Sequence, residues 1–127
     1  MKKLFAGALV VCGIVAAHQV SAGCTYPIAP GKFPDGSAAT RDEMATAKSA
    51  VLKYDADMNS YLVCIRAAYD EKRAAQSDTT AQQRTQMQRM HMQKEDAALA
   101  EVQDVVTRFN EQLKAWQEKN IVENKSS

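Results

Sequence analysis

Apolar side chains recur between residues 44 and 68 at alternating spacings of three and four, the repeat of a helix that packs along one side. The positions in this line are Met44, Ala47, Val51, Tyr54, Met58, Tyr61, Ile65 and Ala68. Leu52, Leu62 and Tyr69 lie beside the line and widen it into a face suited to globular packing. The pattern predicts a long amphipathic helix, which we place at about 41–76.

A second apolar run follows after a polar interval, and it predicts a second helix at about 81–120. Its members are Met92, Leu99, Val102, Val106, Phe109, Leu113 and Trp116. Thr40-x-x-Glu43 and Thr80-x-x-Gln83 each match a capping box, so a helix is expected to begin after each threonine. The residues just before the second box, 77–80, all favour caps and turns.

Two helices of similar length joined by a short polar connection predict an all-α fold, an antiparallel two-helix hairpin resembling a coiled coil. The alternative is one continuous helix, which would be stable only in an oligomeric coiled coil. Residues 123–127 are polar, and we expect a disordered tail there.

Residues 23–40 have a different composition, because every proline of the chain lies here. Each proline fixes its own φ and favours extended geometry in the residue before it, and Pro34-Asp35-Gly36 is a turn signal. We therefore expect an extended N-terminal arm that ends in a turn. The apolar residues that should pack it against the helices are Tyr26, Ile28 and Phe33.

The first 22 residues have the three parts of a bacterial Sec signal peptide. Lys2 and Lys3 are followed by an apolar run of 14 residues, Leu4–Ala17, and Val20-Ser21-Ala22 provides the small residues of a cleavage site. A membrane-spanning helix needs about 20 apolar residues, so we expect cleavage after Ala22 and no membrane anchor. The sequence thus predicts a periplasmic or secreted protein.

Cleavage would remove Cys12 and leave two cysteines in an oxidising compartment, which predicts a disulfide between Cys24 and Cys64. Cys64 lies about 36 Å along the first helix, and the extended arm reaches about 50 Å, so the arm is long enough to run back to it. The alternative is a lipoprotein, since Ser21-Ala22-Gly23-Cys24 partly matches the motif that is cleaved before an acylated cysteine.

The amino-acid composition argues against several classes of protein. The 127 residues include 16 Lys and Arg against 15 Asp and Glu, a formal charge of +1, which argues against a strongly basic nucleic-acid binder. The hydrophobic content of 46% is too high and too periodic for general disorder. Five Gly and three Pro are too few for the turns of an all-β fold.

The N-terminal half carries a resemblance. Cys24-x-x-Pro27-x-x-Pro30-x-x-x-Pro34-Asp35-Gly36, followed by Glu43-Met44, Val51-x-x-Tyr54, Met58-x-x-Tyr61 and Cys64, resembles a group of small uncharacterised secreted proteins of proteobacteria. The resemblance implies an exported helical protein and identifies no site. The architecture is also similar, more loosely, to periplasmic helical-hairpin chaperones and metal-stress proteins.

Few residues of the chain are candidates for a metal or catalytic site. Met87, Met90 and His91 would share one helix face, and these soft donors would suit Cu(I) or Ag(I), although methionine at such spacing also serves as core packing. No nucleophile motif or paired-carboxylate spacing is present, and we expect no catalytic residues and no cofactor.

We therefore expect a non-enzymatic protein that binds protein or peptide partners in the cell envelope, with a homodimer as a further possibility. Tyr54, Tyr61 and Tyr69 would either belong to the core or form a partner-binding stripe. The alternatives are an envelope metal-binding or stress protein that uses the Met/His cluster, and a small enzyme inhibitor whose arm is the binding loop.

Overall fold

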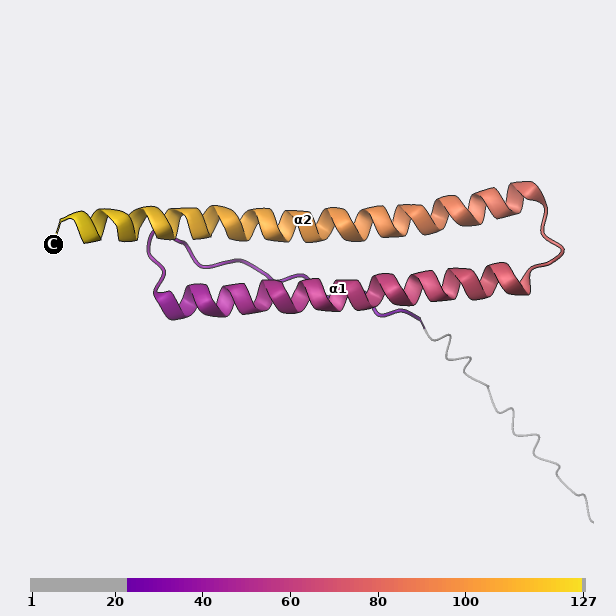
Figure 1. Ribbon diagram of the computed structural model, residues 1–127, viewed down its shortest axis with the longest axis horizontal. Coiled ribbons are helices and arrows are strands. Elements are labelled where there is room, and N and C mark those ends of the chain that lie inside the picture. The colour runs from indigo at the N-terminus through magenta and orange to yellow at the C-terminus, as the bar shows by residue number, and fades with distance from the viewer. Residues whose placement is uncertain (1–22, 127) are drawn as a thin grey trace, which may run out of the picture.

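The computed structural model describes residues 23–126, which form an antiparallel hairpin of two long α-helices (Figure 1). Helix α1 spans Arg41–Ala75 and helix α2 spans Ala81–Lys125, with 35 and 45 residues respectively. The predicted all-α hairpin is confirmed for this part of the chain. The signal peptide expected at residues 1–22 lies outside the described residues.

Both helices begin with the capping boxes that the sequence predicts. The hydroxyl oxygen of Thr40 accepts the Glu43 N–H at 3.2 Å, and the Glu43 carboxylate accepts the Thr40 N–H at 2.8 Å. Thr80 and Gln83 make the same reciprocal pair at 3.2 and 2.9 Å. Each pair satisfies donors that the first turn leaves free, so the connection at residues 76–80 is bounded by a defined helix start.

Helix α2 is longer than expected, and the disordered tail predicted from residue 123 is wrong as far as residue 125. No glycine or proline interrupts the chain after Gly36, so nothing in the sequence ends the helix at residue 120. The helix ends at Lys125, where the Ser126 N–H donates to the Glu123 carbonyl at 3.3 Å.

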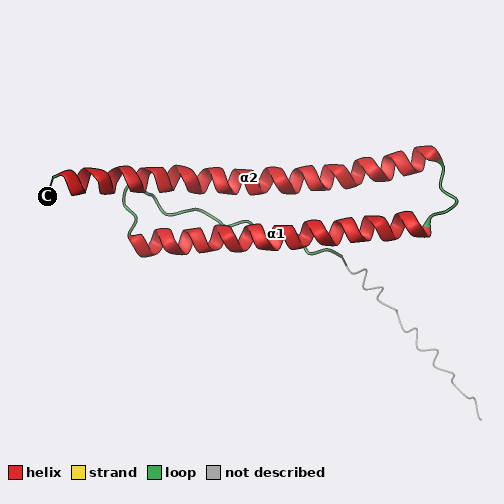
Figure 2. Cartoon of the chain, in the orientation of Figure 1, coloured by secondary structure: helices red, strands yellow, loops and turns green. Residues whose placement is uncertain are grey.

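The arm, residues 23–40, runs back along the hairpin as a loop without regular structure (Figure 2). Cys24 is bonded to Cys64 of α1 with an S–S distance of 2.05 Å, so the predicted disulfide is confirmed. At its other end the arm turns at Asp35, whose carbonyl accepts the N–H groups of Ala38 and Ala39 at 3.0 and 2.7 Å. One sulfur cannot both join Cys64 and carry a diacylglycerol, so the disulfide and the lipoprotein alternative exclude each other.

The core lies between α1, α2 and the turn of the arm. The line predicted on α1 is confirmed from Met44 to Met58 and again at Ile65. The side chains of α1 and the arm that are buried together in the core cluster are Ala39, Met44, Ala47, Val51, Tyr54 and Met58, and those of α2 are Ala98, Val105 and Phe109.

The predicted line on α2 is confirmed in part, since Phe109 is buried in the core and Val102, Val106, Leu113 and Trp116 are partly buried against it. Leu99 is 56% exposed, whereas Ala98 and Val105 are fully buried, and Met92 is also exposed. The arm also packs on α2, through Phe33 against Phe109. Ala98 and Val105 therefore join Phe109 in the buried stripe of α2, whereas Leu99 and Met92 lie outside it.

Two further expectations about apolar residues are wrong. Ile28 is 94% exposed, because the side chains that the arm turns toward the core are instead Ala29 and Phe33, as alternation along an extended chain allows. Leu52, expected to widen the face of α1, is also exposed. It lies next to Val51, beyond the edge that α2 covers.

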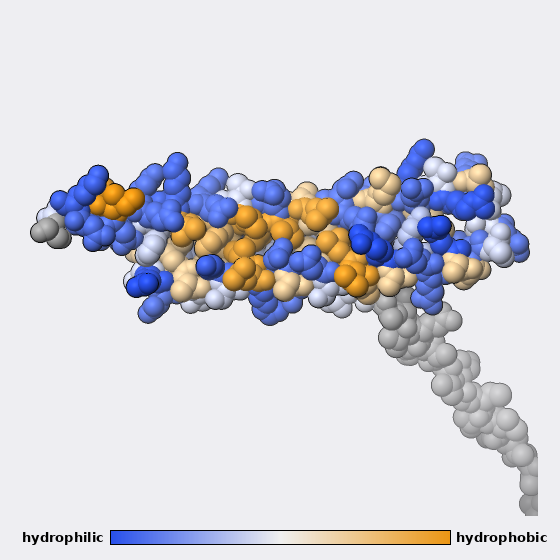
Figure 3. All heavy atoms as spheres, viewed as in Figure 1, coloured by the Kyte–Doolittle hydropathy of each residue, from blue (hydrophilic) through white to orange (hydrophobic). Residues whose placement is uncertain are grey.

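Close packing stops partway along the hairpin. No residue between 66 and 97 is buried, although both helices continue through this stretch to the connection. Apolar side chains gather over the middle of the hairpin, and the end near the connection is largely hydrophilic (Figure 3). Within residues 23–126, no helix has a stretch long and apolar enough to span a membrane.

Candidate functional site

The arm occupies one half of the groove between the helices. The Tyr26 ring contacts the Tyr61 ring edge-on at 4.8 Å, and its hydroxyl donates to Oε2 of Glu101 at 2.5 Å. Further along, Phe33 packs on Phe109 with the ring centroids 5.7 Å apart. The arm therefore touches both helices, although the disulfide ties it to α1 alone.

Gly36 brings the arm closest to α2. Its N–H donates to Oε1 of Gln112 at 3.0 Å. A Cβ at this position would lie 1.8 Å from the Gln112 carbonyl oxygen and 3.0 Å from the Trp116 nitrogen. Both atoms belong to the backbone of a helix, so glycine is needed here for space.

Glu101 places a negative charge beside two tyrosines of this part of the hairpin. Burial and the negative charge of Glu101 raise the pKa of Tyr54 to about 12. Burial and then the hydrogen bond to Glu101 raise the pKa of Tyr26 above its usual range. The hydrogen bond of Tyr26 to Glu101 holds the arm against α2, whereas the buried Tyr54 hydroxyl has no hydrogen-bond partner among the described residues.

Beyond the arm the groove is open. A hollow of about 730 Å³ begins at Gly23 and Cys24 and continues between the helices to Thr79. We call this hollow the distal groove. Its lining residues on α1 are Tyr61, Ile65, Ala68, Tyr69 and Lys72, those of the connection are Gln76 and Thr79, and those on α2 are Gln83, Gln86, Met87, Met90, His91 and Lys94.

His91 is fixed in the wall of the distal groove. Its imidazole stacks on the Tyr69 ring at 4.3 Å with an interplanar angle of 4°. Its Nε2 lies 3.4 Å from Oε1 of Glu95, which also pairs with Arg66 of α1 at 3.0 Å. These contacts link the two helices where the buried core has ended, and they keep the groove walls in register.

The structure brings the three candidate metal ligands into the same groove, since Met87, Met90 and His91 all line it. The charged residues in the lining are Lys72 and Lys94, which oppose the entry of a cation. Within residues 23–126, no group of three or more His, Cys, Asp or Glu is arranged to hold a metal ion. The positive charges of the lining therefore suit an anionic occupant.

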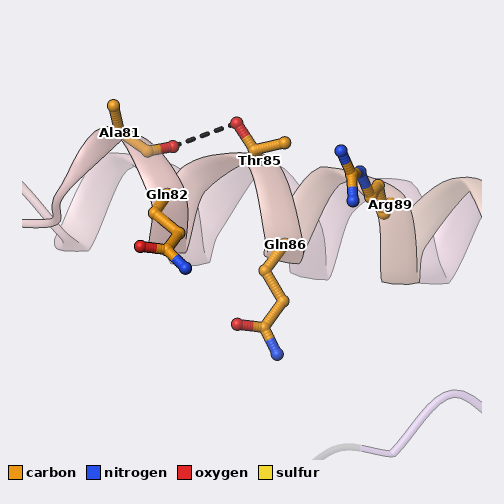
Figure 4. A pocket seen from close by; sticks show the side chains of 5 residues that line it. All are labelled: Ala81, Gln82, Thr85, Gln86 and Arg89. Carbon is orange, nitrogen blue, oxygen red and sulfur yellow. Dashed lines mark hydrogen bonds between the residues drawn. The ribbon is translucent and has the colours of Figure 1, made fainter.

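Two other hollows lack the walls of a binding site. One is lined by Ala81, Gln82, Thr85, Gln86 and Arg89, which all lie on α2, so the depression runs along a single helix (Figure 4). The other, about 340 Å³, lies beside the disulfide between the arm and α1 and is lined by Thr25, Pro27, Asp57, Ser60, Tyr61 and Cys64.

Sequence reasoning missed the distal groove, although a signal for it was present. Where the apolar repeat would continue past Ala68, the chain has Lys72, and the α2 side of the groove is lined by the polar Gln83 and Gln86. Loss of apolar residues from both sides of a hairpin indicates a place where the helices do not seal against each other.

Comparison of this chain with protein-family models, with curated proteins and with solved structures finds no match.

Proposed function

We propose that this is an exported, non-enzymatic protein of the cell envelope that holds a segment of a protein or peptide partner in the distal groove. One observation carries the proposal: the arm fills one half of the groove between the helices, and the other half is open. The groove therefore already accommodates an extended segment along part of its length.

The apolar surface of the distal groove supports binding. Met90 is 53% exposed, and Ala68, Tyr69 and Met87 are only half-buried. Covering apolar surface is worth about 25 cal/mol per Å². A partner side chain placed between Tyr69 and Met87 would gain this energy without displacing any close-packed residue.

Export is supported by the sequence of residues 1–22 and by the disulfide. A bond between Cys24 and Cys64 persists in an oxidising compartment, such as the bacterial periplasm or the exterior. A non-enzymatic role is supported by how the half-buried acids are used, since Glu101 fixes the arm through Tyr26 and Glu95 joins the helices through Arg66.

A displayed library of random hexapeptides tests the proposed function, with Ala68→Trp as the groove-filling variant. Ala68 lines the distal groove, and Ala67 beside it is exposed on the outside of α1, so Ala67→Trp is the matched control. We expect peptides selected on the wild type to bind Ala67→Trp and not Ala68→Trp. Equal binding to all three proteins would place the peptides elsewhere and contradict the proposal.

The metal alternative is tested on the same groove. Tight binding of Cu(I) that is lost in Met90→Leu would assign Met87, Met90 and His91 to a metal site. Absence of Cu(I) binding would contradict the metal alternative.

A second candidate function, inhibition of a protease by the arm, is favoured by Ile28. This side chain is 94% exposed although it lies between Pro27 and Pro30, in a segment held at both ends by contacts with the hairpin. Inhibition of an elastase-type protease that is lost in Ile28→Asp would support it. A wild-type protein that leaves such proteases fully active would contradict it.

A further inference from the structure

We propose that the distal groove selects a short extended peptide that carries two acidic side chains. This inference rests on the proposed function and names the chemistry of the partner. It is carried by the length of the groove, by its continuity with the site of the arm and by the charges of its lining.

The length of the groove limits the occupant. The lining runs from Tyr61 of α1 to Gln76 just past its end, and from Gln83 to Lys94 on α2. The two stretches advance by about 22 and about 16 Å. An extended chain advances about 3.1 Å per residue, so the groove holds about five to seven residues.

An extended occupant fits better than a helical one. A helix with its side chains is about 10–12 Å across, so it would have to force α1 and α2 apart. That would break the contacts of Tyr69 with His91 and of Arg66 with Glu95. The arm already lies extended between the same helices, and the groove opens where the arm starts, at Gly23 and Cys24.

The polar lining suits an exposed peptide backbone. Gln76, Gln83 and Gln86 line the groove, and each side-chain amide offers both donors and an acceptor. An extended chain leaves its N–H and C=O groups unpaired, so it can use these amides along its length.

The charges of the lining select acidic side chains. Lys72 and Lys94 both line the groove and are exposed, and neither has a resolved ion pair. The stacking of Tyr69 on His91 sets the level of the two helices, so Lys94 lies level with about residue 66 of α1. Lys72 is then about 9 Å further along the groove. Two acidic residues that are two or three apart in an extended chain span this distance.

Fluorescence anisotropy with three labelled octapeptides tests the inference. The peptides are identical except at two positions separated by one valine, which are both Glu, both Gln or both Lys. Exposed ion pairs are weak, so the Glu peptide should bind about tenfold more tightly than the Lys peptide at low salt. This preference should disappear at high salt, because both lysines are exposed.

Charge reversal supplies the matched variants. The double variant Lys72→Glu/Lys94→Glu should prefer the Lys peptide, a reversal that a purely structural effect would not produce. Lys114 is exposed on α2 away from the groove, and Lys114→Glu should leave the preference unchanged. Circular dichroism checks that each variant keeps its helices.

The outcomes separate this inference from the proposed function. If the three peptides bind equally and all are lost in Ala68→Trp, the groove binds peptides without regard to charge and only the acidic preference is overturned. If the Glu peptide does not bind at all, the acidic preference is likewise overturned, and the library selection still decides the proposed function. If the peptides bind Ala68→Trp as tightly as the wild type, both fail.

Discussion

Gly36→Ala should destabilise the protein far more than Gly31→Ala, although both replace a glycine of the arm. At Gly36 the new Cβ would overlap the Gln112 carbonyl oxygen at 1.8 Å, and a helix backbone cannot yield by that distance. At Gly31 no atom lies within 4 Å of a new Cβ. Neither glycine has a positive φ, so the difference between them is one of space.

The expected loss follows from the contacts that Gly36 makes possible. Lifting the turn away from α2 breaks the hydrogen bond to Gln112, worth about 1 kcal/mol. It also separates Phe33 from Phe109, an aromatic contact worth about 1 kcal/mol beyond the area it buries. With partial exposure of Phe33, we expect Gly36→Ala to lower the free energy of unfolding by about 2–4 kcal/mol.

The control variant Gly31→Ala should be slightly more stable than the wild type. Gly31→Ala restricts the unfolded chain and should stabilise the fold by about 0.4–1 kcal/mol. Urea unfolding followed by circular dichroism measures both values, and trypsin cleavage at Lys32 reports whether the arm has lifted. Equal free energies of unfolding for the two variants would refute the close contact between the arm and α2.

Three further predictions concern the disulfide, the register of α2 and the buried tyrosine. Replacing Cys24 and Cys64 together by Ser should lower the free energy of unfolding by about 2–4 kcal/mol, since closing a loop of this length is worth about 4 kcal/mol. The far-UV circular dichroism spectrum should remain helical. Unchanged stability would mean that the disulfide does not stabilise the fold. In urea unfolding, Val105→Ala should lower the free energy of unfolding by about 2 kcal/mol and Leu99→Ala by less than about 1 kcal/mol, because Val105 is buried and Leu99 is exposed. The apolar repeat suggests the reverse order. The pKa of Tyr54 is raised to about 12 in the folded protein, whereas the unfolded chain loses the tyrosine proton near pH 10. Stability should therefore fall as the pH rises from about 10 to about 12. Tyr54→Phe should lose less stability over this window in urea titrations, and an equal loss would show that Tyr54 does not contribute.

Local sequence signals predicted the helices better than their packing. The capping boxes at Thr40 and Thr80 gave the helix starts, because a capping box involves residues only three apart. The apolar repeat gave the buried line on α1 correctly. On α2 it included Phe109 but missed Ala98 and Val105, since a repeat along one helix contains no information about the contact of Phe33 with Phe109.

The candidate site was predicted in part. The pairing of Cys24 with Cys64 followed from the number of cysteines and from the reach of the arm. The distal groove did not, because a hollow depends on where two helices stop sealing, and this depends on polar residues whose positions resemble those of an ordinary exposed face. Lys72 follows Ala68 in the apolar repeat, and the structure makes it part of the groove wall.

The position of the disulfide has a consequence for the order of assembly. Both cysteines precede α2 in the chain, so closing the covalent loop involves no residue of the second helix. Helix α2 then docks on a surface that already includes the arm, and Phe33 and Gly36 favour one of its faces through Phe109 and Gln112. The arm thus favours one register of α2 against α1.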